Sequence, residues 1–231
     1  MKIGALIQAR MQSTRAPGKV LRPLAGRPLL AYLLDRLERA KDLDLVAVAT
    51  SDSSADDPIE TFCAEQEVAC HRGPLEDVAG RFVAAARRFE LDALVRVNGD
   101  SPFLDQDLVT TGVELFRQAE VDLVTNVFPR SFPVGASVEV ISAPVLGEVR
   151  AETSRPDDLE HVTQFFYRHP DRFRIVAFSA EEDHSGESLA FDQPRDAEEI
   201  EAVLALMRRP HWDYGWKEVL ELQASARVEA P

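Results

Sequence analysis

Cysteine, long apolar runs and an excess of positive charge are scarce or absent in this chain of 231 residues. Its two cysteines, Cys63 and Cys70, are too few for a disulfide framework or a zinc site, and we interpret each as a small buried hydrophobe. The 26 Lys and Arg residues against 40 Asp and Glu residues give a formal net charge of −14. That is the wrong sign for binding nucleic acid or anionic lipid. No apolar stretch approaches the roughly 18 residues that a transmembrane helix needs. The composition therefore predicts neither a nucleic-acid nor a membrane partner.

The first residues carry no recognisable secretion signal. They read MKIGALIQAR, a short apolar run followed by Arg, without a small-residue cleavage site. Hydrophobic residues make up 45% of the chain, which is enough to build a core. We therefore expect an acidic globular protein in the cytoplasm.

Four familiar catalytic or phosphate-binding motifs are missing. Gly18 and Lys19 are followed by Val20, where a P-loop requires Ser or Thr. No G-x-G-x-x-G follows the first apolar run, which argues against a dinucleotide site. H-E-x-x-H and G-x-S-x-G are also absent. A function for this chain must rest on other residues.

The first 125 residues alternate short apolar runs with amphipathic segments. The pattern predicts strands at 3–7, 45–49, 68–71, 93–97 and 121–125, and helices at 28–40, 57–67, 75–90 and 105–119. Apolar runs of this length are typical of strands buried on both faces, and the alternation is typical of parallel sheets covered by helices. We predict an α/β fold with three layers, α/β/α, around a mainly parallel sheet.

The second half is less regular. Here the pattern predicts strands at 137–141, 173–178 and 189–191, and helices at 157–169, 196–208 and 214–222. The segment 137–141 alternates as if one of its faces were solvated. No break in composition marks a second domain, so we predict one domain, 1–231, with an excursion at about 126–180.

A cluster of cations follows the first predicted strand. Arg10, Arg15 and Lys19 lie in a loop that also contains Ser13 and has no apolar pattern. Ligands of parallel sheets bind at the carboxyl ends of the strands, where this loop must lie. Guanidinium and ammonium groups converging there suit a polyphosphate, although a solvated basic loop is the alternative.

Two aspartates follow other apolar runs. Asp100 comes directly after the strand predicted at 93–97, and Asp192 follows the one at 189–191. Mg²⁺ takes one or two carboxylates together with phosphate oxygens, so this pair is a candidate magnesium site. For Asp100, a helix-capping or turn aspartate is the alternative.

Three further candidates are less specific. His161 lies on a predicted helix, where a packed or surface histidine is the alternative. Glu139 lies on the polar face of 137–141, and a solvated surface explains it equally well. Arg72 follows the third strand and can face the same site.

The segments 8–21, 24–30, 96–102, 132–140, 160–163 and 191–196 resemble, in order, those of the SpsF-like spore-coat polysaccharide cytidylyltransferases. These are relatives of the CMP-Kdo and CMP-sialic acid synthetases. The opening QARMQSTRAPGKVL is the most specific part, and the resemblance extends over nearly the whole chain. It implies the Rossmann-like fold of nucleotide-diphospho-sugar transferases, of the glycosyltransferase-A type.

The resemblance also implies roles for individual residues. The catalytic residues would be Arg10, Lys19 and Asp100, and the Mg²⁺ ligands would be Asp100 and Asp192. The sugar contacts would be Glu139, His161 and Ser137. The nucleotide contacts would be Gln8, Ala9, Arg10, Ser13, Arg15, Lys19, Asn98 and Asp100, together with Arg72, which is a candidate from its position after the third strand.

The chain departs from the family pattern at three places. Ala16 stands where Leu is usual, and residues 191–193 read FDQ where VDT is common. Ser137 stands where the family commonly has Asp, which puts the usual sugar contact in doubt.

The expected reaction is attack of an acidic sugar's hydroxyl on the α-phosphorus of CTP, giving a CMP-sugar and pyrophosphate for surface polysaccharide synthesis. The alternatives are a glycosyltransferase that uses a preformed nucleotide sugar and a regulatory protein that binds nucleotide without turnover. The resemblance further implies a homodimer formed through the excursion at 126–180.

Overall fold

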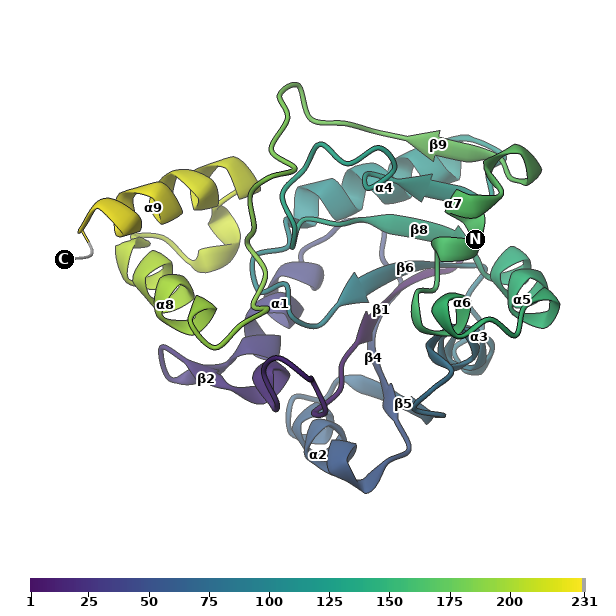
Figure 1. The fold of residues 1–231 in the computed structure, drawn as a ribbon, viewed down its shortest axis with the longest axis horizontal. Helices are drawn as coiled ribbons and strands as arrows, with labels where there is room; N and C mark the ends of the chain where they lie inside the picture. The colour runs from purple at the N-terminus through teal and green to yellow at the C-terminus, as the bar shows by residue number, and fades with distance from the viewer. Residues whose placement is uncertain (230–231) are drawn as a thin grey trace.

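A computed structural model describes residues 1–229, and its centre is a seven-stranded sheet in the order β5-β4-β1-β6-β8-β7-β9 (Figure 1). The strands are β1 (Ile3–Gln8), β4 (Leu45–Ser51), β5 (Ala69–Gly73), β6 (Ala93–Asn98), β7 (Leu123–Thr125), β8 (Glu139–Ser142) and β9 (Ile175–Ala177). All neighbouring strands are parallel except β8, which is antiparallel to both β6 and β7. A separate two-stranded hairpin joins β2 (Pro23–Leu24) to β3 (Arg27–Pro28).

Helices cover both faces of this sheet. One face packs against α1 (Leu29–Leu37), α2 (Asp57–Glu65) and α4 (Gln106–Gln118). The other packs against α3 (Val78–Arg88), α5 (Ala143–Glu152) and α7 (Gln164–Arg168), with α6 (Pro156–Glu160) beside them. Short 3₁₀ turns lie at Lys19–Leu21, Ser54–Asp56, Pro170–Arg172 and His211–Asp213. The three-layer α/β/α fold with a mainly parallel sheet, predicted from the alternation of apolar runs, is confirmed.

Strand β1 shows why these residues form a central strand. Ile3, Ala5 and Ile7 point to the α1 face, and Leu6 to the α3 face, all fully buried. Because side chains alternate along a strand, only a continuous apolar run can serve a strand covered on both sides.

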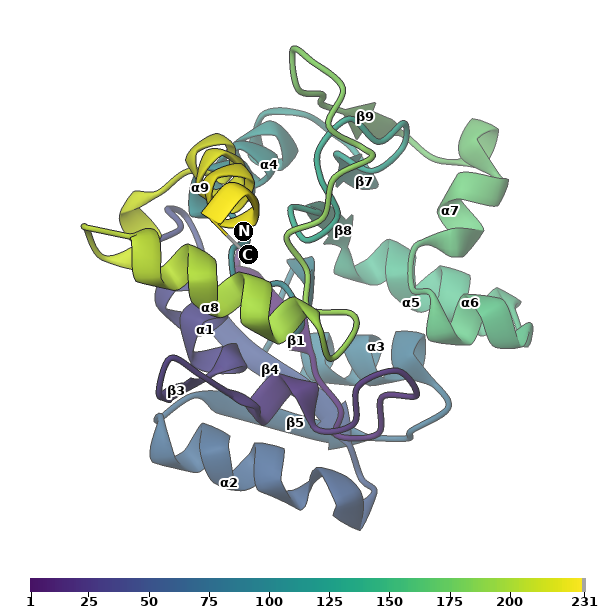
Figure 2. The same cartoon turned by 60° about the vertical axis from the view of Figure 1, so that its left-hand side comes forward.

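The last two helices, α8 (Asp196–Leu206) and α9 (Trp216–Glu229), lie side by side at the edge of the molecule next to α1 (Figure 2). Ile200 of α8 and Val219 of α9 are buried in one cluster with Leu24 and Leu29. This cluster brings the chain after residue 180 back to the amino-terminal segment.

Three predictions at this level are wrong in detail. The helix expected at 157–169 is two helices, α6 and α7, because the chain turns at 161–163 to bury Val162 and Thr163. No strand forms at 189–191, since Leu189 donates its N–H to the carbonyl of Val134 whereas Phe191 donates to that of Asp100. The segment 137–141 has no solvated face, because β8 lies inside the sheet between β6 and β7.

Over residues 1–229, none of the helices combines the length and apolar character that spanning a membrane demands. The single domain and the dimer through 126–180 stay predictions.

Candidate active site

The site forms where β1 and β6 end side by side. Gln8 and Asn98 are register partners at the carboxyl ends of these two parallel strands. Gly99 follows Asn98 and donates its N–H to the carbonyl of Gln8 at 2.9 Å. A Cβ at Gly99 would lie 2.8 Å from that same oxygen, so only glycine allows this approach. The close contact places the next residue, Asp100, beside the loop that follows β1.

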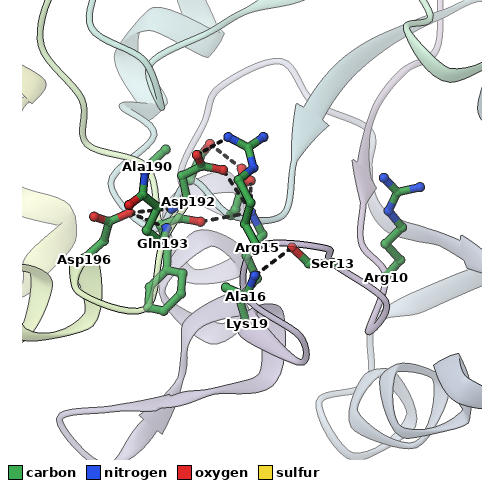
Figure 3. Close-up of polar contacts among 12 residues, drawn as sticks. Arg10, Ser13, Arg15, Ala16, Lys19, Ala190, Asp192, Gln193 and Asp196 are labelled. Atoms are coloured by element: carbon green, nitrogen blue, oxygen red, sulfur yellow. Dashed lines mark hydrogen bonds and ion pairs between the residues drawn. The ribbon is translucent and has the colours of Figure 1, made fainter. Parts of the chain in front are cut away.

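That loop is closed by its own hydrogen bonds. The carbonyl of Met11 accepts from the N–H groups of Ser13 at 3.0 Å and Gly18 at 2.8 Å. The N–H of Met11 in turn donates to Asp56 at 2.7 Å. Gly18 has a φ of 73°, in the left-handed region that favours glycine. The folded loop directs Arg15 and Lys19 toward the strand ends and leaves Arg10 on the opposite side (Figure 3).

Two cations of the loop meet two carboxylates. Lys19 Nζ lies 2.6 Å from Asp100 Oδ2 and 3.9 Å from Asp192 Oδ1, and it also donates to the carbonyl of Phe191 at 3.0 Å. Arg15 forms an ion pair with Asp192 (Figure 3). The Lys19 side chain is only 12% exposed, whereas Asp100 and Asp192 are 26% and 35% exposed. The carboxylates therefore remain accessible while the lysine is held between them.

Asp192 is held here although it lies far from the loop in sequence. Phe191 donates its N–H to the carbonyl of Asp100 at 2.8 Å. Asp196, the first residue of α8, accepts from the N–H groups of Asp192 and Gln193, each at 2.7 Å. These bonds fix the segment 191–193 against the end of β6.

An open cleft of about 300 Å³ lies at these strand ends. Its lining residues come from the β1 loop, the end of β6, the turn after α6 and the segment 191–193. They are Gln8, Arg10, Ser13, Thr14, Arg15, Lys19, Val20, Arg96, Asn98, Gly99, Asp100, Glu160, His161 and Asp192. The structure thus brings together most of the predicted site residues.

On the far side of the cleft, Arg10 forms an ion pair with Glu160, with Nη2 2.8 Å from Oε1. The neighbouring His161 is exposed and lines the cleft. Arg10 therefore lies across the cleft from Lys19, and the loop presents cations on two sides.

Glu139 is not a solvated surface residue, as one interpretation of the sequence allowed. Its side chain is 2% exposed, and Arg96 Nη1 donates to its Oε2 at 2.8 Å. The hydroxyl of Tyr167 donates to its other oxygen. Burial and the neighbouring Glu139 raise the pKa of Tyr167, which keeps that hydroxyl protonated as a donor. Glu139 is thus a buried, fully paired carboxylate behind the cleft wall.

Besides Glu139, three other predicted site residues do not line the cleft. Arg72 forms ion pairs with Asp57 at 2.8 Å and with Glu60 at 2.7 Å, on the α2 side of the sheet. A nucleotide contact by Arg72 requires these pairs to open. Ala9 is 1% exposed and lies beneath the loop. Ser137 contacts Arg130 instead of the cleft.

Sequence reasoning missed the contributions of Arg96 and Glu160. Arg96 interrupts the apolar run 93–97, and a cation inside a buried strand is a signal that a partner carboxylate lies nearby. Nothing in the sequence pairs Glu160 with Arg10, since 150 positions separate them.

The two aspartates fit a magnesium ion held jointly with phosphate oxygens. A cationic group, Lys19 Nζ, already lies between Asp100 and Asp192, so the position favours positive charge. Mg²⁺ is bound in many phosphate sites by one or two carboxylates plus the substrate's own oxygens. Among residues 1–229, no cluster of three or more acidic, His or Cys side chains is arranged to hold a metal without such oxygens.

A mainly parallel sheet with a cationic loop and a pair of carboxylates at its carboxyl edge suits a protein that binds the phosphates of a nucleotide. A family model described as cytidylyltransferase matches residues 4–219. The chain therefore belongs to the cytidylyltransferase family.

Individual relatives agree with this family. The chain is 34% identical over 206 residues to the spore coat polysaccharide biosynthesis protein SpsF of Bacillus subtilis (strain 168), covering 86% of this chain and 84% of SpsF. It is 34% identical over 130 residues to a 3-deoxy-manno-octulosonate cytidylyltransferase of Anaeromyxobacter sp. (strain Fw109-5), covering 55% and 52% of the two chains.

A solved cytidylyltransferase structure from Leptospira borgpetersenii superposes with a TM-score of 0.93 at 28% identity, over 99% of this chain and 96% of that one. The structure of CMP:2-keto-3-deoxy-manno-octonic acid synthetase complexed with CTP shares the fold, with a TM-score of 0.68 at 19% identity over 89% of this chain and 99% of that one.

Proposed function

We propose that this cytidylyltransferase transfers the CMP group of CTP to a hydroxyl of an acidic sugar, in a magnesium-dependent reaction that releases pyrophosphate. The observation that carries the proposal is the meeting of Lys19 and Arg15 with Asp100 and Asp192 at the carboxyl edge of the sheet. Further support for the proposal comes from the likeness to the 3-deoxy-manno-octulosonate cytidylyltransferase of Anaeromyxobacter sp.. The name of SpsF supports a role for the product in polysaccharide synthesis.

In this reaction the sugar oxygen forms a bond to the α-phosphorus, and the bond from that phosphorus to the α–β bridging oxygen breaks. Pyrophosphate leaves with the electron pair, and the hydroxyl proton passes to solvent. Little covalent chemistry falls to the protein, so positioning and charge neutralisation supply most of the acceleration.

Asp100 and Asp192 would hold the Mg²⁺, which supplies positive charge to the phosphate oxygens. Lys19 and Arg15 would then exchange their carboxylate partners for phosphate oxygens and neutralise the charge that builds on pyrophosphate. Arg10 would bind the triphosphate from the other side of the cleft. Asn98 and Gln8 line the cleft floor between these groups and would contact the nucleotide.

A pyrophosphate-release assay with Mg²⁺ tests this proposal. CTP, UTP, GTP and ATP are each combined with 3-deoxy-manno-octulosonate, with other sugar acids and with neutral hexoses. We expect release with CTP and a sugar acid. Calorimetry with CTP and Mg²⁺ runs in parallel, because CTP binding without pyrophosphate release for any acceptor would contradict the proposal and favour a regulatory protein.

Two variants test the site itself. Lys19→Ala and Asp100→Asn should each lower pyrophosphate release by about a hundredfold or more, in line with the loss of one preorganised charge at a reacting centre. Lys41→Ala and Asp107→Asn change exposed residues of the same types outside the cleft, and they should retain the wild-type rate. Near-wild-type turnover of both site variants would rule out this assignment of the active site.

A further inference from the structure

The loop of residues 126–138, which joins β7 to β8, contains one arginine, Arg130. Asn126 is fully buried and crosslinks this loop. Its Nδ2 donates to the carbonyl of Ala136 at 2.8 Å, and its Oδ1 accepts from the N–H of Val138 at 2.7 Å. The loop is also held from outside, because Val134 donates its N–H to the carbonyl of Glu187 at 2.9 Å. These bonds hold the backbone of the loop in place.

Arg130 is the cation of that loop, and it is half-buried. Its Nη2 donates to Ser137 Oγ at 3.0 Å and its Nη1 to the carbonyl of Pro133 at 3.4 Å. Both acceptors are neutral, and within residues 1–229 no carboxylate lies at ion-pair distance from its guanidinium. Burial lowers the pKa of Arg130 in spite of nearby Glu139 and Tyr167. A guanidinium withdrawn from water without a counter-ion is stabilised by an anion that supplies one.

The carboxylate that acts electrostatically on Arg130, Glu139, is already engaged. Glu139 uses one oxygen for Arg96 at 2.8 Å and the other for the hydroxyl of Tyr167. That hydroxyl is further bonded to Thr125 Oγ1 at 2.8 Å. Because this network occupies both oxygens of Glu139, the charge of Arg130 has no paired carboxylate among the described residues.

The sheet places the Arg130 loop at the same edge as the cleft, although Arg130 is not among the residues that line the cleft. β8 is antiparallel to β6 with Arg96 opposite Glu139, so Ser137, two residues before Glu139, lies toward the Asn98 end of β6. Strands β1, β6 and β8 are consecutive in the sheet (Figure 1). The cationic loop follows β1, Asp100 follows β6, and the Arg130 loop precedes β8. The triphosphate and the acceptor can therefore occupy opposite sides of Asp100.

We infer that Arg130 binds the carboxylate of the acceptor sugar and sets the preference for acidic acceptors, an assignment that rests on the cytidylyl transfer proposed above. The planar guanidinium matches a carboxylate with two parallel hydrogen bonds, which an ammonium group cannot reproduce. Ser137 accepts a hydrogen bond from Arg130 through a neutral hydroxyl, so it does not compensate the charge of Arg130. The ring of Phe128, 41% exposed and stacked on Tyr167 at 4.7 Å, provides an apolar surface in the same loop.

Four variants separate this role from a structural one. Arg130→Met removes the charge, and Arg130→Lys keeps the charge but loses the fork. Ser137→Asp places a carboxylate where Arg130 already donates, and Ser137→Ala is its matched control. The acceptors are 3-deoxy-manno-octulosonate, other sugar acids and the methyl ester of each acid. Each variant is first checked for an unchanged melting temperature.

We expect Arg130→Met and Ser137→Asp to raise the KM for the sugar acid about tenfold or more, while the KM for CTP stays within twofold. Arg130→Lys should give a KM between those of these variants and the wild type. Ser137→Ala removes one hydrogen bond to Arg130 but adds no charge, so it should raise the KM for the sugar acid less than Ser137→Asp does. With the methyl ester, wild type and Arg130→Met should have the same KM. Calorimetric titration of the sugar acid, in the presence of Mg²⁺ and an α,β-methylene analogue of CTP, should show the same loss of affinity without turnover.

The other outcomes separate the two proposals. If pyrophosphate is released with a sugar acid and its KM is unchanged in Arg130→Met, the assignment of Arg130 is wrong and the cytidylyltransferase activity stands. A wild-type preference for the methyl ester or a neutral hexose leads to the same conclusion. Failure of every acceptor overturns the proposed function and this assignment together.

Discussion

Replacing Arg96 by Met should strongly destabilise the protein, because Arg96 is the counter-ion of a carboxylate that has almost no access to water. Glu139 is 2% exposed and Arg96 15% exposed, and the charged atoms are 2.8 Å apart. At that separation and an effective dielectric constant of about 20, the Coulomb attraction is about 6 kcal/mol before desolvation is subtracted. Removing one partner of a buried pair costs about 3–5 kcal/mol, because the other charge stays buried and unpaired. We expect a loss of that size in the free energy of unfolding.

Urea unfolding followed by far-UV circular dichroism measures this loss, with an unchanged slope against denaturant as evidence of a common unfolded state. The double variant Arg96→Met with Glu139→Gln should recover most of the stability, since it leaves no buried charge. The control is Arg172→Met, whose partner Glu152 lies at 2.9 Å with both side chains nearly half exposed. The Arg172→Met change should lower the free energy of unfolding by no more than about 1 kcal/mol. A double variant no more stable than Arg96→Met would refute the reasoning.

Three other predictions concern the strand ends, pH and ligand binding. Gly99→Ala should lower the free energy of unfolding by about 1–3 kcal/mol and slow pyrophosphate release, because a Cβ would lie 2.8 Å from the Gln8 carbonyl oxygen. An unchanged urea unfolding curve would contradict this, since it would show that the strand ends can separate freely. Burial lowers the pKa values of His71 and His211, so the unfolded chain binds protons that the folded chain does not. Stability should therefore fall as pH drops from about 7.5 to 5.5, through the ordinary histidine pKa of about 6.5, and changing both residues to Gln should flatten the slope measured by urea unfolding. In thermal unfolding, CTP and Mg²⁺ together should raise the melting temperature by more than the sum of the shifts that each gives alone. The carboxylates that would hold Mg²⁺ already have cationic partners, and these cations would first have to exchange the carboxylates for the phosphates of CTP. Purely additive shifts would contradict coupled binding.

The layered fold could be predicted because its strands are buried on both faces. A run such as Ile3–Gln8 has no polar face to expose, and its alternation with amphipathic helices leaves few arrangements other than a covered parallel sheet. The position of β8 could not be predicted in this way. Its alternation resembles that of a half-exposed strand, and only its insertion between β6 and β7 reveals that Glu139 is a buried, paired charge.

The amino-acid sequence by itself determined the chemistry available at the site: cations after one strand, an aspartate after another, and glycines where the backbone must turn. These features are local in the sequence. They come together at one site because the carboxyl ends of parallel strands meet at one edge in any such sheet. Only the tertiary structure decided which charges are matched. Lys19 meets Asp192 and Arg10 meets Glu160, whereas within the described part of the chain Arg130 donates only to neutral acceptors. The ion pairs of Lys19 and Arg10 join residues brought together by the return of the chain, and electrostatic pairing depends on distance and burial, which no local pattern encodes.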